Sequence, residues 1–406
     1  MVNERVNVSI IGQGYVGLPL SLAAANAGWI VTGVEIDESR FRILESGASP
    51  IESLDENEIQ RLSALGKYKV ENNFESLQSA SIVVVCVPTP LSASGIPDLT
   101  PLRGAVEEID RYCVPNTLII NESTSHPETL RNLFSRRLES NQTQQRFDYA
   151  VAPERIDPGN TLYSIGNTPR IVGALSERAL IRVFEFYNSF TAEVIKVSSP
   201  EVAELAKLLE NSFRLVNISL VNELSMLSAK IGIDSREVIK AAATKPFGFM
   251  PFFPSVGIGG HCIPIDPVYL SEYSKTKGVK QTLIERAKEL DTEMSDLVVG
   301  QIKSRFPEVS SITIVGIGYK SGSKDTRLSP SIRLMRSLRN QRYEVDWIDS
   351  VVQEFLGEKS AVELTSDLAI LTSTDSSFDS ERYLSLGGKI LDFTGTLMSQ
   401  EGVFRF

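Results

Sequence analysis

The stretch that decides the fold is VNVSIIGQGYVGLPLSLAAANAGWIVTGVEID, residues 6–37. It predicts a buried strand over 6–11, a helix over about 18–27 and a second strand over 30–34. Three glycines of Gly12-Gln13-Gly14-Tyr15-Val16-Gly17 stand between the first strand and the helix. They permit a tight turn and the close approach of a pyrophosphate to the helix N-terminus. The stretch therefore predicts a dinucleotide-binding Rossmann domain.

Two charged residues beyond the second strand bear on the choice of cofactor. Glu35 stands about 20 residues after the glycine turn, where an acid accepts the ribose hydroxyls of NAD. Arg40 lies close enough to leave NADP as an alternative. We expect NAD, held by Gly12, Gly14, Tyr15, Val16, Gly17, Glu35 and Arg40, with Pro88, Thr89, Thr124 and Arg327 from later turns.

Three further apolar strands are predicted over 82–87, 118–120 and 149–151. They run into the turns Pro88-Thr89-Pro90, Glu122-Ser123-Thr124 and Pro153-Glu154-Arg155. In an open parallel sheet, ligands bind beyond the carboxyl ends of the strands, so these turns are expected to line one crevice. Cys86, inside the first of these strands, and Cys113 are interpreted as core residues.

The segment Gly259-Gly260-His261-Cys262-Ile263-Pro264-Ile265-Asp266-Pro267 indicates chemistry. Its glycines let the backbone approach a bound molecule, and its prolines stiffen the turn between Cys262 and Asp266. The alternative is a loop with a buried, inert cysteine, since most free cysteines are packing residues. His261 has no base among its sequence neighbours, and we assign it no catalytic role.

A long helical pattern runs from about 200 to 231 and carries Lys207, Asn211 and Arg214 on one stripe. A solvated polar face is the alternative explanation, although Asn is a poor residue for a helix interior unless it has a partner. After the helix, residues 311–319 repeat the strand and glycine turn of residues 8–15, with Ser321 in the place of Gly17. Lys320, Lys324 and Arg327 crowd this second turn and suggest a phosphate of another ligand.

These patterns predict an α/β fold of two Rossmann-like, doubly wound parallel-sheet domains joined by a long central helix. Further strands are expected over 344–349 and 367–371. The predicted domains are an NAD-binding domain over 1–197, a helical domain with the cysteine loop over 198–300, and a C-terminal Rossmann-like domain over 301–406. The thiol is expected to face the cleft between the two halves.

Composition narrows the class of protein. The chain has 406 residues, of which 42% are hydrophobic and 23% charged, as in a globular protein. A net charge of -10 argues against nucleic-acid binding. No apolar run reaches the roughly 20 residues of a membrane span, and no signal peptide is evident. Three scattered cysteines predict a reducing cytoplasm, and two histidines cannot build a His-rich metal site.

The motifs, taken in order, resemble those of nucleotide-sugar 6-dehydrogenases, the UDP-glucose/GDP-mannose dehydrogenase family. The resemblance covers nearly the whole chain, and the cysteine loop is its most specific motif. It rests on Gly12–Gly17, 87–90, 122–124, 153–155, Lys207 with Asn211, 222–223, 259–266 and 318–327. It implies an N-terminal NAD domain, a helical homodimer-forming linker and a C-terminal domain that holds the nucleoside diphosphate.

The resemblance also implies a mechanism, in which two equivalents of NAD oxidise the C6 hydroxyl of the sugar to an acid. Cys262 would form a thiohemiacetal and then a thioester. The implied catalytic residues are Cys262, Lys207, Asp266, Glu154, Asn211 and Thr124. Lys207 would also lower the pKa of the Cys262 thiol. The implied substrate-binding residues are Glu154, Arg155, Lys207, Asn211, Arg214, Phe253, Gly257, Gly259 and Lys320.

The third turn is similar to the branch of the family that oxidises UDP-N-acetylhexosamines, UDP-GlcNAc most of all. Pro158 stands where UDP-glucose enzymes keep a glutamate, and with Gly159 it would leave room for an acetamido group. Glu128, Ser255-Val256-Gly257 and Asp392-Phe393-Thr394-Gly395 depart from the usual motifs.

Alternatives remain at two levels. UDP-ManNAc and UDP-glucose are the alternative substrates, and the expected product would serve cell-surface or secondary-metabolite glycan synthesis. A two-electron β-hydroxyacid dehydrogenase of the 6-phosphogluconate type shares the first fingerprint but needs no cysteine. A non-catalytic NAD-binding scaffold would not need to keep the reactive residues present here.

Overall fold

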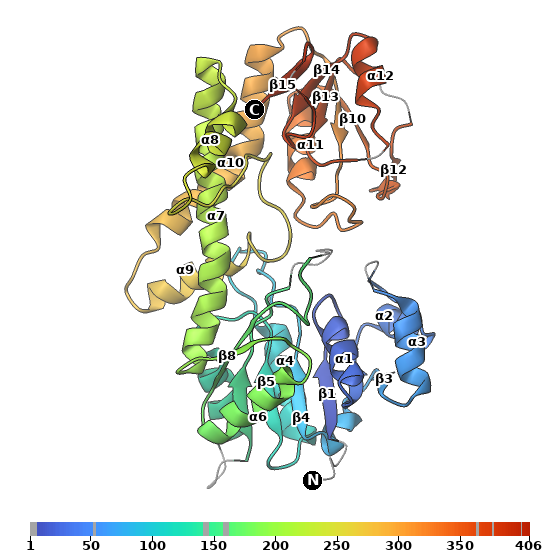
Figure 1. The fold of residues 1–406 in the computed structure, drawn as a ribbon, viewed down its shortest axis with the longest axis vertical. Coiled ribbons are helices and arrows are strands. Elements are labelled where there is room, and N and C mark those ends of the chain that lie inside the picture. The colour runs from blue at the N-terminus through green and yellow to red at the C-terminus, as the bar shows by residue number, and fades with distance from the viewer. Residues whose placement is uncertain are drawn as a thin grey trace. The chain divides into compact units, whose positions relative to one another are not determined.

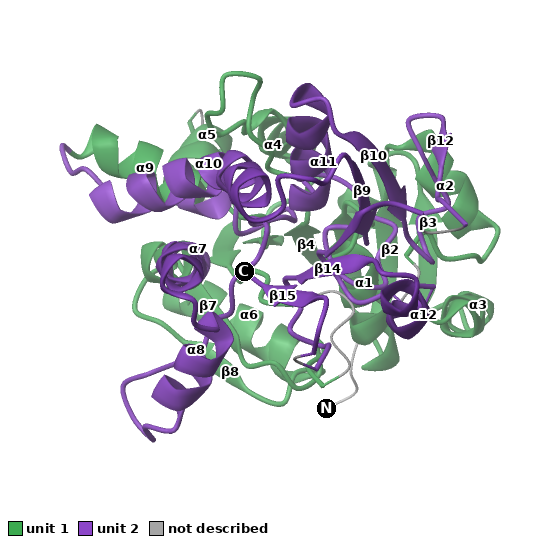
Figure 2. Ribbon diagram, turned by 90° about the horizontal axis from the view of Figure 1, so that it is seen from above, with its two compact units in different colours: residues 1–210, 268–277 green, residues 211–267, 278–406 purple. Residues whose placement is uncertain are grey.

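The structure is a computed structural model that describes residues 6–51, 54–140, 146–156, 162–362, 365–375, 377–398 and 400–406. The chain forms two compact units (Figure 2). Unit 1 comprises residues 1–210 and 268–277, and unit 2 comprises 211–267 and 278–406. The divisions fall inside α7 (Pro200–Ile231), which is 32 residues long (Figure 1), and inside α9 (Asp266–Thr276). The three-domain division expected from the sequence stays a prediction.

Unit 1 is built on an eight-stranded sheet of order β3-β2-β1-β4-β5-β6-β7-β8. All neighbouring strands are parallel except β6 and β7. The strand order reverses between β1 and β4, which is where a doubly wound sheet opens a crevice at its carboxyl ends. The strands are β1 (Asn7–Ile11), β2 (Ile30–Val34), β3 (Tyr68–Glu71), β4 (Ile82–Val85), β5 (Leu118–Asn121), β6 (Asp148–Val151), β7 (Arg170–Ala174) and β8 (Val194–Lys196).

Both faces of this sheet are covered by helices. Because successive strand residues point to opposite faces, Val84 packs in one hydrophobic cluster and Val83 and Val85 in another. Several helices begin at an acid or serine whose side chain accepts a backbone N–H, as Asp37 does. The helices are α1 (Gly17–Asn26), α2 (Glu38–Glu45), α3 (Glu56–Ala64), η1 (Glu75–Ser79), α4 (Thr100–Tyr112), η2 (Leu130–Ser135), α5 (Arg136–Leu138) and α6 (Glu177–Asn188).

Unit 2 has a second parallel sheet of order β10-β9-β13-β14-β15. Leu368 and Ile370 of β13 pack on one face, and Ala369 and Leu371 on the other. Its strands are β9 (Ser311–Val315), β10 (Glu344–Ile348), β13 (Leu368–Leu371), β14 (Lys389–Asp392) and β15 (Val403–Arg405), with a hairpin of β11 (Glu354–Phe355) and β12 (Glu358–Lys359). Its helices include α8 (Ser235–Ala243), α10 (Thr282–Arg305), α11 (Pro330–Asn340) and α12 (Ser380–Ser385).

The two Rossmann-like sheets and the long helix confirm the predicted fold class. One local expectation was wrong: β4 ends at Val85, so Cys86 lies beyond the strand rather than inside it. The chain turns there toward the prolines at 88 and 90, which have no N–H to continue the ladder. Burial nevertheless raises the pKa of the Cys86 thiol well above its usual range. Cys113 is buried in the core, as expected.

Candidate functional site

The first glycine turn is shaped to receive a dinucleotide. A Cβ on Gly17 would lie 1.8 Å from the carbonyl oxygen of Gly12, so no other residue allows α1 to begin so close to the turn. A Cβ on Gly14 would meet nothing within 4 Å, so the outer edge of the turn is open. Helix α1 begins at Gly17 without a side-chain cap, and the helix dipole gives this end a partial positive charge that suits a phosphate. The turn therefore fits the pyrophosphate of NAD.

Glu35 directly follows β2, and its carboxylate is buried against the turn. It accepts the backbone N–H of Gln13 at 3.0 Å and that of Asp37 at 2.9 Å. Nη1 of Arg40 lies 3.1 Å from Oε2 of Glu35, so the arginine that could favour NADP is paired with the acid that favours NAD. Tyr15 at the turn is exposed, and Val16 is half-buried.

The other expected cofactor residues of unit 1 lie in turns at the carboxyl ends of neighbouring strands. Thr89 and Thr124, which follow β4 and β5, are half-buried, and Pro88 is exposed. Since β4 and β5 are adjacent and parallel, these turns meet at one edge of the sheet, as expected.

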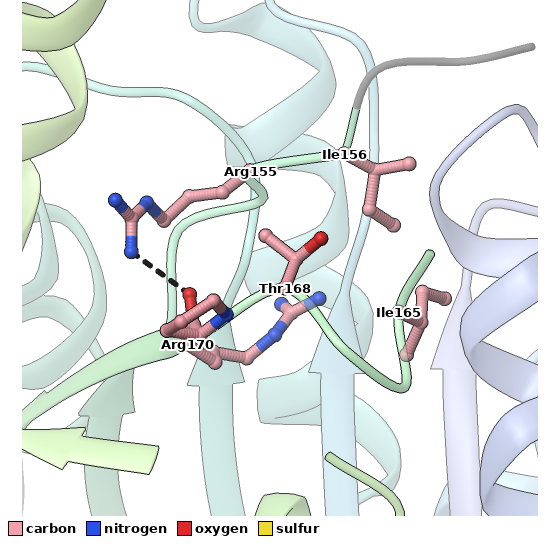
Figure 3. A pocket seen from close by; sticks show the side chains of 6 residues that line it. Arg155, Ile156, Ile165, Thr168 and Arg170 are labelled. Atoms are coloured by element: carbon pink, nitrogen blue, oxygen red, sulfur yellow. Dashed lines mark hydrogen bonds between the residues drawn. The ribbon is translucent and has the colours of Figure 1, made fainter. Parts of the chain in front are cut away.

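The turn after β6 is tied to α7 by two ion pairs. Nζ of Lys207 lies 3.5 Å from Oε2 of Glu154, and Nη2 of Arg155 lies 2.8 Å from Oε1 of Glu210. Nη1 of Arg155 also donates to the carbonyl oxygen of Pro169 at 2.8 Å, beside a small hollow (Figure 3). The turn is thereby held from two sides.

Glu154 is a buried carboxyl with an altered affinity for protons. Burial raises its pKa, and the charges of Lys207 and Arg170 lower it in part. Its Oε1 accepts no hydrogen bond from the described residues. A buried carboxyl whose pKa is moved toward neutrality is suited to handling protons.

In unit 2, the glycine loop that precedes Cys262 is fixed by charged side chains from the helices around it. Asp291 of α10 accepts the N–H of Ile258 at 2.6 Å and pairs with Arg333 of α11 at 3.0 Å. Arg333 donates to the carbonyl oxygen of Ile258 at 3.1 Å. Gly257 has a φ of +137°, and a Cβ there would lie 2.8 Å from Nη2 of Arg333. These contacts with Asp291 and Arg333 hold the loop in place.

Asp266 is the first residue of α9, and Cys262 lies four residues before it. The carbonyl oxygen of Cys262 accepts the N–H groups of Ile265 and Asp266, at 3.1 and 2.8 Å, which makes the turn that leads into the helix. Oδ2 of Asp266 accepts a hydrogen bond of 2.6 Å from Nδ2 of Asn211. This partner explains a buried Asn on α7 and excludes the alternative of a solvated face at Asn211. Asp266 is buried and Cys262 is half-buried.

The second glycine turn lies near His261. Nε2 of His261 is 3.5 Å from Oδ2 of Asp325, so the fold supplies a carboxylate that the sequence neighbours of His261 do not. Asp325 is distant in sequence and could not have been found from the neighbours of His261. The guanidinium of Arg327 forms two hydrogen bonds to Asp325, at 2.9 and 2.8 Å, and the backbone N–H of Arg327 a third at 3.0 Å. Burial lowers the pKa of His261, and the charge of Arg327 adds to this.

Comparison with known proteins decides the family. The UDP-glucose/GDP-mannose dehydrogenase family matches through its NAD binding domain over residues 6–191 and its central domain over 201–293. The chain belongs to this family. It is therefore an NAD-dependent nucleotide-sugar dehydrogenase, an oxidoreductase.

Similar proteins span almost the whole chain. UDP-N-acetyl-D-mannosamine dehydrogenase of Pyrococcus horikoshii is 32% identical over 94% of this chain and 92% of its own. UDP-N-acetyl-D-glucosamine 6-dehydrogenase of Pseudomonas aeruginosa is 32% identical over 85% of this chain and 83% of its own. The solved structure of UDP-D-ManNAc dehydrogenase from Pyrococcus horikoshii covers 98% of both chains, with 30% identity and a TM-score of 0.88.

The dehydrogenase site is only partly assembled from the residues that the sequence predicted. In unit 1 the structure joins Glu154 to Lys207, and in unit 2 it joins Asn211 to Asp266. Arg214 and Phe253 are exposed, Gly259 and Lys320 half-buried, and Arg327 exposed. Pro158 and Gly159, on which the choice of sugar was based, lie outside the described residues.

Sequence reasoning placed Glu122 in a turn that lines the crevice, but it missed the buried Arg170 beside Glu122 and Tyr187, whose hydroxyl donates to Glu122. A charge opening the apolar run 171–174 was the available signal for Arg170. Within the described residues, no group of three or more His, Cys, Asp or Glu could hold a metal ion. None of the described helices is long and apolar enough to cross a membrane.

Proposed function

We propose that this dehydrogenase oxidises the C6 hydroxyl of a UDP-N-acetylhexosamine to the carboxylic acid, with Cys262 as the nucleophile. The observation that carries the proposal is the ordered cysteine loop, in which Asp266 is held at 2.6 Å by Asn211 at the head of α9. An inert packing cysteine would not need a loop fixed by a buried Asn–Asp pair and by Asp291 and Arg333. The relatives' names support the class of sugar.

The roles of the chain's own residues follow from their chemistry. NAD, when bound, accepts one hydride in each of two two-electron steps, which makes two equivalents per sugar. Asp266 and Thr124 hold the water that takes the hydroxyl proton. The Cys262 thiolate then adds to the aldehyde carbon and forms a C–S bond. After the second oxidation, water adds to the thioester and the C–S bond breaks, releasing the acid and restoring the thiolate.

Three polar side chains serve the charged intermediates. Lys207 and Asn211, one turn apart on α7, supply positive charge and a donor for the oxyanion that develops at C6. Glu154 orients the water that hydrolyses the thioester. The raised pKa of Glu154 suits this role, because a base works best when its pKa approaches the working pH.

The assay that tests this function follows NADH with UDP-GlcNAc, UDP-ManNAc, UDP-GalNAc and UDP-glucose. We expect two NADH per sugar and an acid product; one NADH with a free aldehyde would overturn the mechanism. Cys262→Ser should bind the sugar nucleotide but stop before the acid forms. Cys113→Ser is the matched control, because burial raises the pKa of the Cys113 thiol to about 12 and leaves it unreactive.

We take UDP-GlcNAc as the first candidate substrate, from the motifs of the chain, and UDP-ManNAc as the second. The Pyrococcus horikoshii relative, similar over 94% of this chain, favours UDP-ManNAc. The ratio of kcat/KM for UDP-GlcNAc to kcat/KM for UDP-ManNAc decides which of the two is the preferred substrate. A preference for UDP-glucose over both would end the N-acetylhexosamine proposal and leave the reaction type intact.

The UDP group is assigned to the second glycine turn in unit 2. Lys320→Ala should raise KM for the sugar nucleotide by one to two decades, since a lost charge-assisted contact costs about 1.5–3 kcal/mol. KM for NAD should change much less. Equal effects on both constants would remove Lys320 from UDP binding. Arg327 bonds to Asp325, so Arg327→Lys should weaken UDP binding less than Lys320→Ala.

We also propose a homodimer through α7, in the cytoplasm. A stripe of exposed apolar side chains repeats at helical spacing along its whole length, and such a stripe fits a second copy of the same helix. Sedimentation should show a dimer that Leu209→Glu with Leu220→Glu converts to a monomer, while Lys240→Glu on α8 leaves it intact. The stripe comprises Val202, Leu205, Leu209, Phe213, Leu220, Leu227 and Ile231.

A further inference from the structure

Three polar side chains form a buried cluster behind the turn that carries Glu154. Arg170 opens β7 and is only 4% exposed, and Nη1 of Arg170 lies 2.8 Å from Oε2 of the fully buried Glu122. The hydroxyl of Tyr187 donates to Oε1 of Glu122. The guanidinium carbon of Arg170 also lies 4.8 Å from the centre of the Tyr187 ring. A buried ion pair of this kind is costly to assemble and is weak evidence for stability alone.

The cluster reaches the Glu154 turn through the backbone. Nη1 of Arg170 donates to the carbonyl oxygen of Ala152, two residues before Glu154, at 3.4 Å. Arg155, the residue after Glu154, donates in return to the carbonyl oxygen of Pro169 at 2.8 Å (Figure 3). Each arginine side chain therefore donates a hydrogen bond to a backbone carbonyl near the other arginine, and the two bonds join the end of β6 to the start of β7. These bonds fix the backbone on both sides of Glu154.

The charges of Arg170 and Glu122 in the cluster also act on the Glu154 carboxyl. The groups that face its carboxyl are Lys207 from α7, Arg170 from β7, Glu122 from the turn after β5 and Cys86 from the end of β4. Burial raises the pKa of Glu154, Lys207 and Arg170 lower it, and Glu122 raises it. Arg170 and Glu122 thus act on Glu154 with opposite signs.

We propose that Arg170 is a positioning residue for Glu154. In this proposal Glu122, held by Tyr187, is the counter-ion of Arg170 and offsets part of the positive charge that Arg170 presents to Glu154. Arg170 touches neither the sugar nor the cofactor in this role. It holds the turn through Ala152, and its charge opposes the effect of burial on the Glu154 carboxyl that orients water. The inference rests on the proposed function of Glu154 in thioester hydrolysis.

The test measures the decay of the Cys262 thioester after a single turnover, by rapid quench with a labelled sugar nucleotide, from pH 5 to 9. Arg170→Met should move the acidic limb of this rate to higher pH by about one unit, since one unit corresponds to a tenfold change in proton affinity. Glu122→Gln should move the limb to lower pH, because Arg170 then acts unopposed. A purely structural defect would lower the rate at every pH and would not give shifts of opposite sign.

Further variants keep the inference falsifiable if Arg170→Met fails to fold, since it leaves the Glu122 charge buried without its partner. The double variant Arg170→Met with Glu122→Gln removes both charges and should return the limb close to that of the wild type. Arg170→Lys should keep the limb in place but slow the reaction, because one ammonium cannot hold both Glu122 and Ala152. KM for NAD should change less than twofold in all of them.

Glu154→Gln separates the two levels of the argument. If the acidic limb disappears in Glu154→Gln but stays unmoved in the Arg170 and Glu122 variants, the positioning role is overturned and the function of Glu154 stands. If Glu154→Gln keeps the wild-type rate and limb, the proposed function of Glu154 fails and the positioning role fails with it. Opposite shifts in Arg170→Met and Glu122→Gln, lost in the double variant, would support the inference.

Discussion

The two glycine turns of this chain begin alike and end differently. In each, the first glycine has a positive φ and packs on the end of a neighbouring strand: a Cβ on Gly12 would meet the carbonyl oxygen of Cys86, and one on Gly316 would meet Ser373. Beyond that point the first turn stays open at Gly14. In the second, a Cβ on Gly318 would lie 2.5 Å from the carbonyl oxygen of Ser323, because the chain folds back over its own turn.

The acid that follows the second strand shows the same contrast. Glu35 in unit 1 and Asp349 in unit 2 each accept N–H groups from their glycine turn. Asp349 accepts two N–H groups from that turn and two from Val351 and Val352, which fill the four positions of a carboxylate. Glu35 accepts two backbone N–H groups and one exposed arginine. Only Glu35 keeps capacity for a ribose hydroxyl.

The difference teaches that a strand and a glycine turn do not by themselves make a dinucleotide site. In unit 1 the third glycine, Gly17, lets α1 begin at the turn, so that the positive end of the helix dipole lies there. In unit 2 Ser321 takes that place, and no helix begins before α11 at Pro330. A phosphate at the second turn, as proposed for the UDP group, would therefore be held by side chains rather than by a helix N-terminus.

The largest effect on folding and on NAD binding is expected from a substitution at the third glycine of the first turn, Gly17. Gly17→Val should prevent unit 1 from folding or abolish NAD binding, because backbone at 1.8 Å cannot move aside and even ordinary overpacking costs about 1–3 kcal/mol. Gly14→Ala is the matched control at the open edge and should fold normally but bind NAD at least about tenfold more weakly. Gly318→Ala should destabilise unit 2 while the NAD Kd stays unchanged. Calorimetry measures the stability of each variant, and NAD titration measures its Kd. A Gly17→Val variant that folds and binds NAD would contradict the difference drawn between the two glycine turns.

The stability of unit 1 and the stability of unit 2 should also change in opposite directions with pH. In unit 1, burial raises the pKa of Glu204 to about 8, so the folded state binds a proton more tightly than the unfolded chain. Stability from this group is lost as pH rises from about 4.5 to about 8, by on the order of 5 kcal/mol in all. In unit 2, backbone N–H groups of Ser310 and Ser311 lower the pKa of Asp367 to about 2, so stability is lost as pH falls below about 4.

Thermal melts across pH of two single variants test these signs. Glu204→Gln should flatten the fall in Tm between pH 5 and 8 and leave the acid side alone. Asp367→Asn should reduce the loss of Tm between pH 4 and 2 and leave the neutral range alone. If Glu204→Gln retains the wild-type slope, the carboxyl is ionised in the folded protein, stabilised by its hydrogen bonds from the N–H groups of Glu128 and Leu130.

Cofactor choice tests the two acids directly. Because Glu35 repels a 2′-phosphate, the wild type should prefer NAD to NADP by at least about tenfold, or about 1.4 kcal/mol. Glu35→Ser frees Arg40 from its pair and should reverse or abolish the preference. Asp349→Asn in unit 2 should leave the preference unchanged. Equal use of both cofactors by the wild type would mean that Arg40 outweighs Glu35.

How much the sequence could predict follows from the range of the interactions involved. The strands flanking Gly12 and Gly316 and the exact span of α7 were predicted correctly, since apolar periodicity and glycine spacing are local signals. The short strands β3 and β8 have no such pattern and were missed, and β7 was missed although residues 171–174 form an apolar run. Asp325 beside His261, and Arg170 beside Glu122, are pairs over 48 residues or more, which only the fold brings together.

The smallest effect is expected where each unit holds a non-glycine residue in the left-handed region just before a helix. Glu128 has a φ of +71° two residues before η2, and Leu328 has a φ of +52° two residues before α11. Glycine relieves the strain, worth about 1–2 kcal/mol, but loses about 0.5–1 kcal/mol of that through its more flexible unfolded chain. Leu328→Gly should therefore raise Tm by about 1–3 °C.

Glu128→Gly should give less, although the same strain is relieved. Its carboxylate pairs with Lys277 at 2.9 and 3.1 Å, and glycine loses that pair as well. Glu128→Gln separates the two contributions, because it keeps the backbone strain and loses only the charge. We expect the order of Tm to be Leu328→Gly, then Glu128→Gly, then Glu128→Gln. If Glu128→Gly gains as much as Leu328→Gly, the exposed pair of Glu128 with Lys277 contributes nothing to stability.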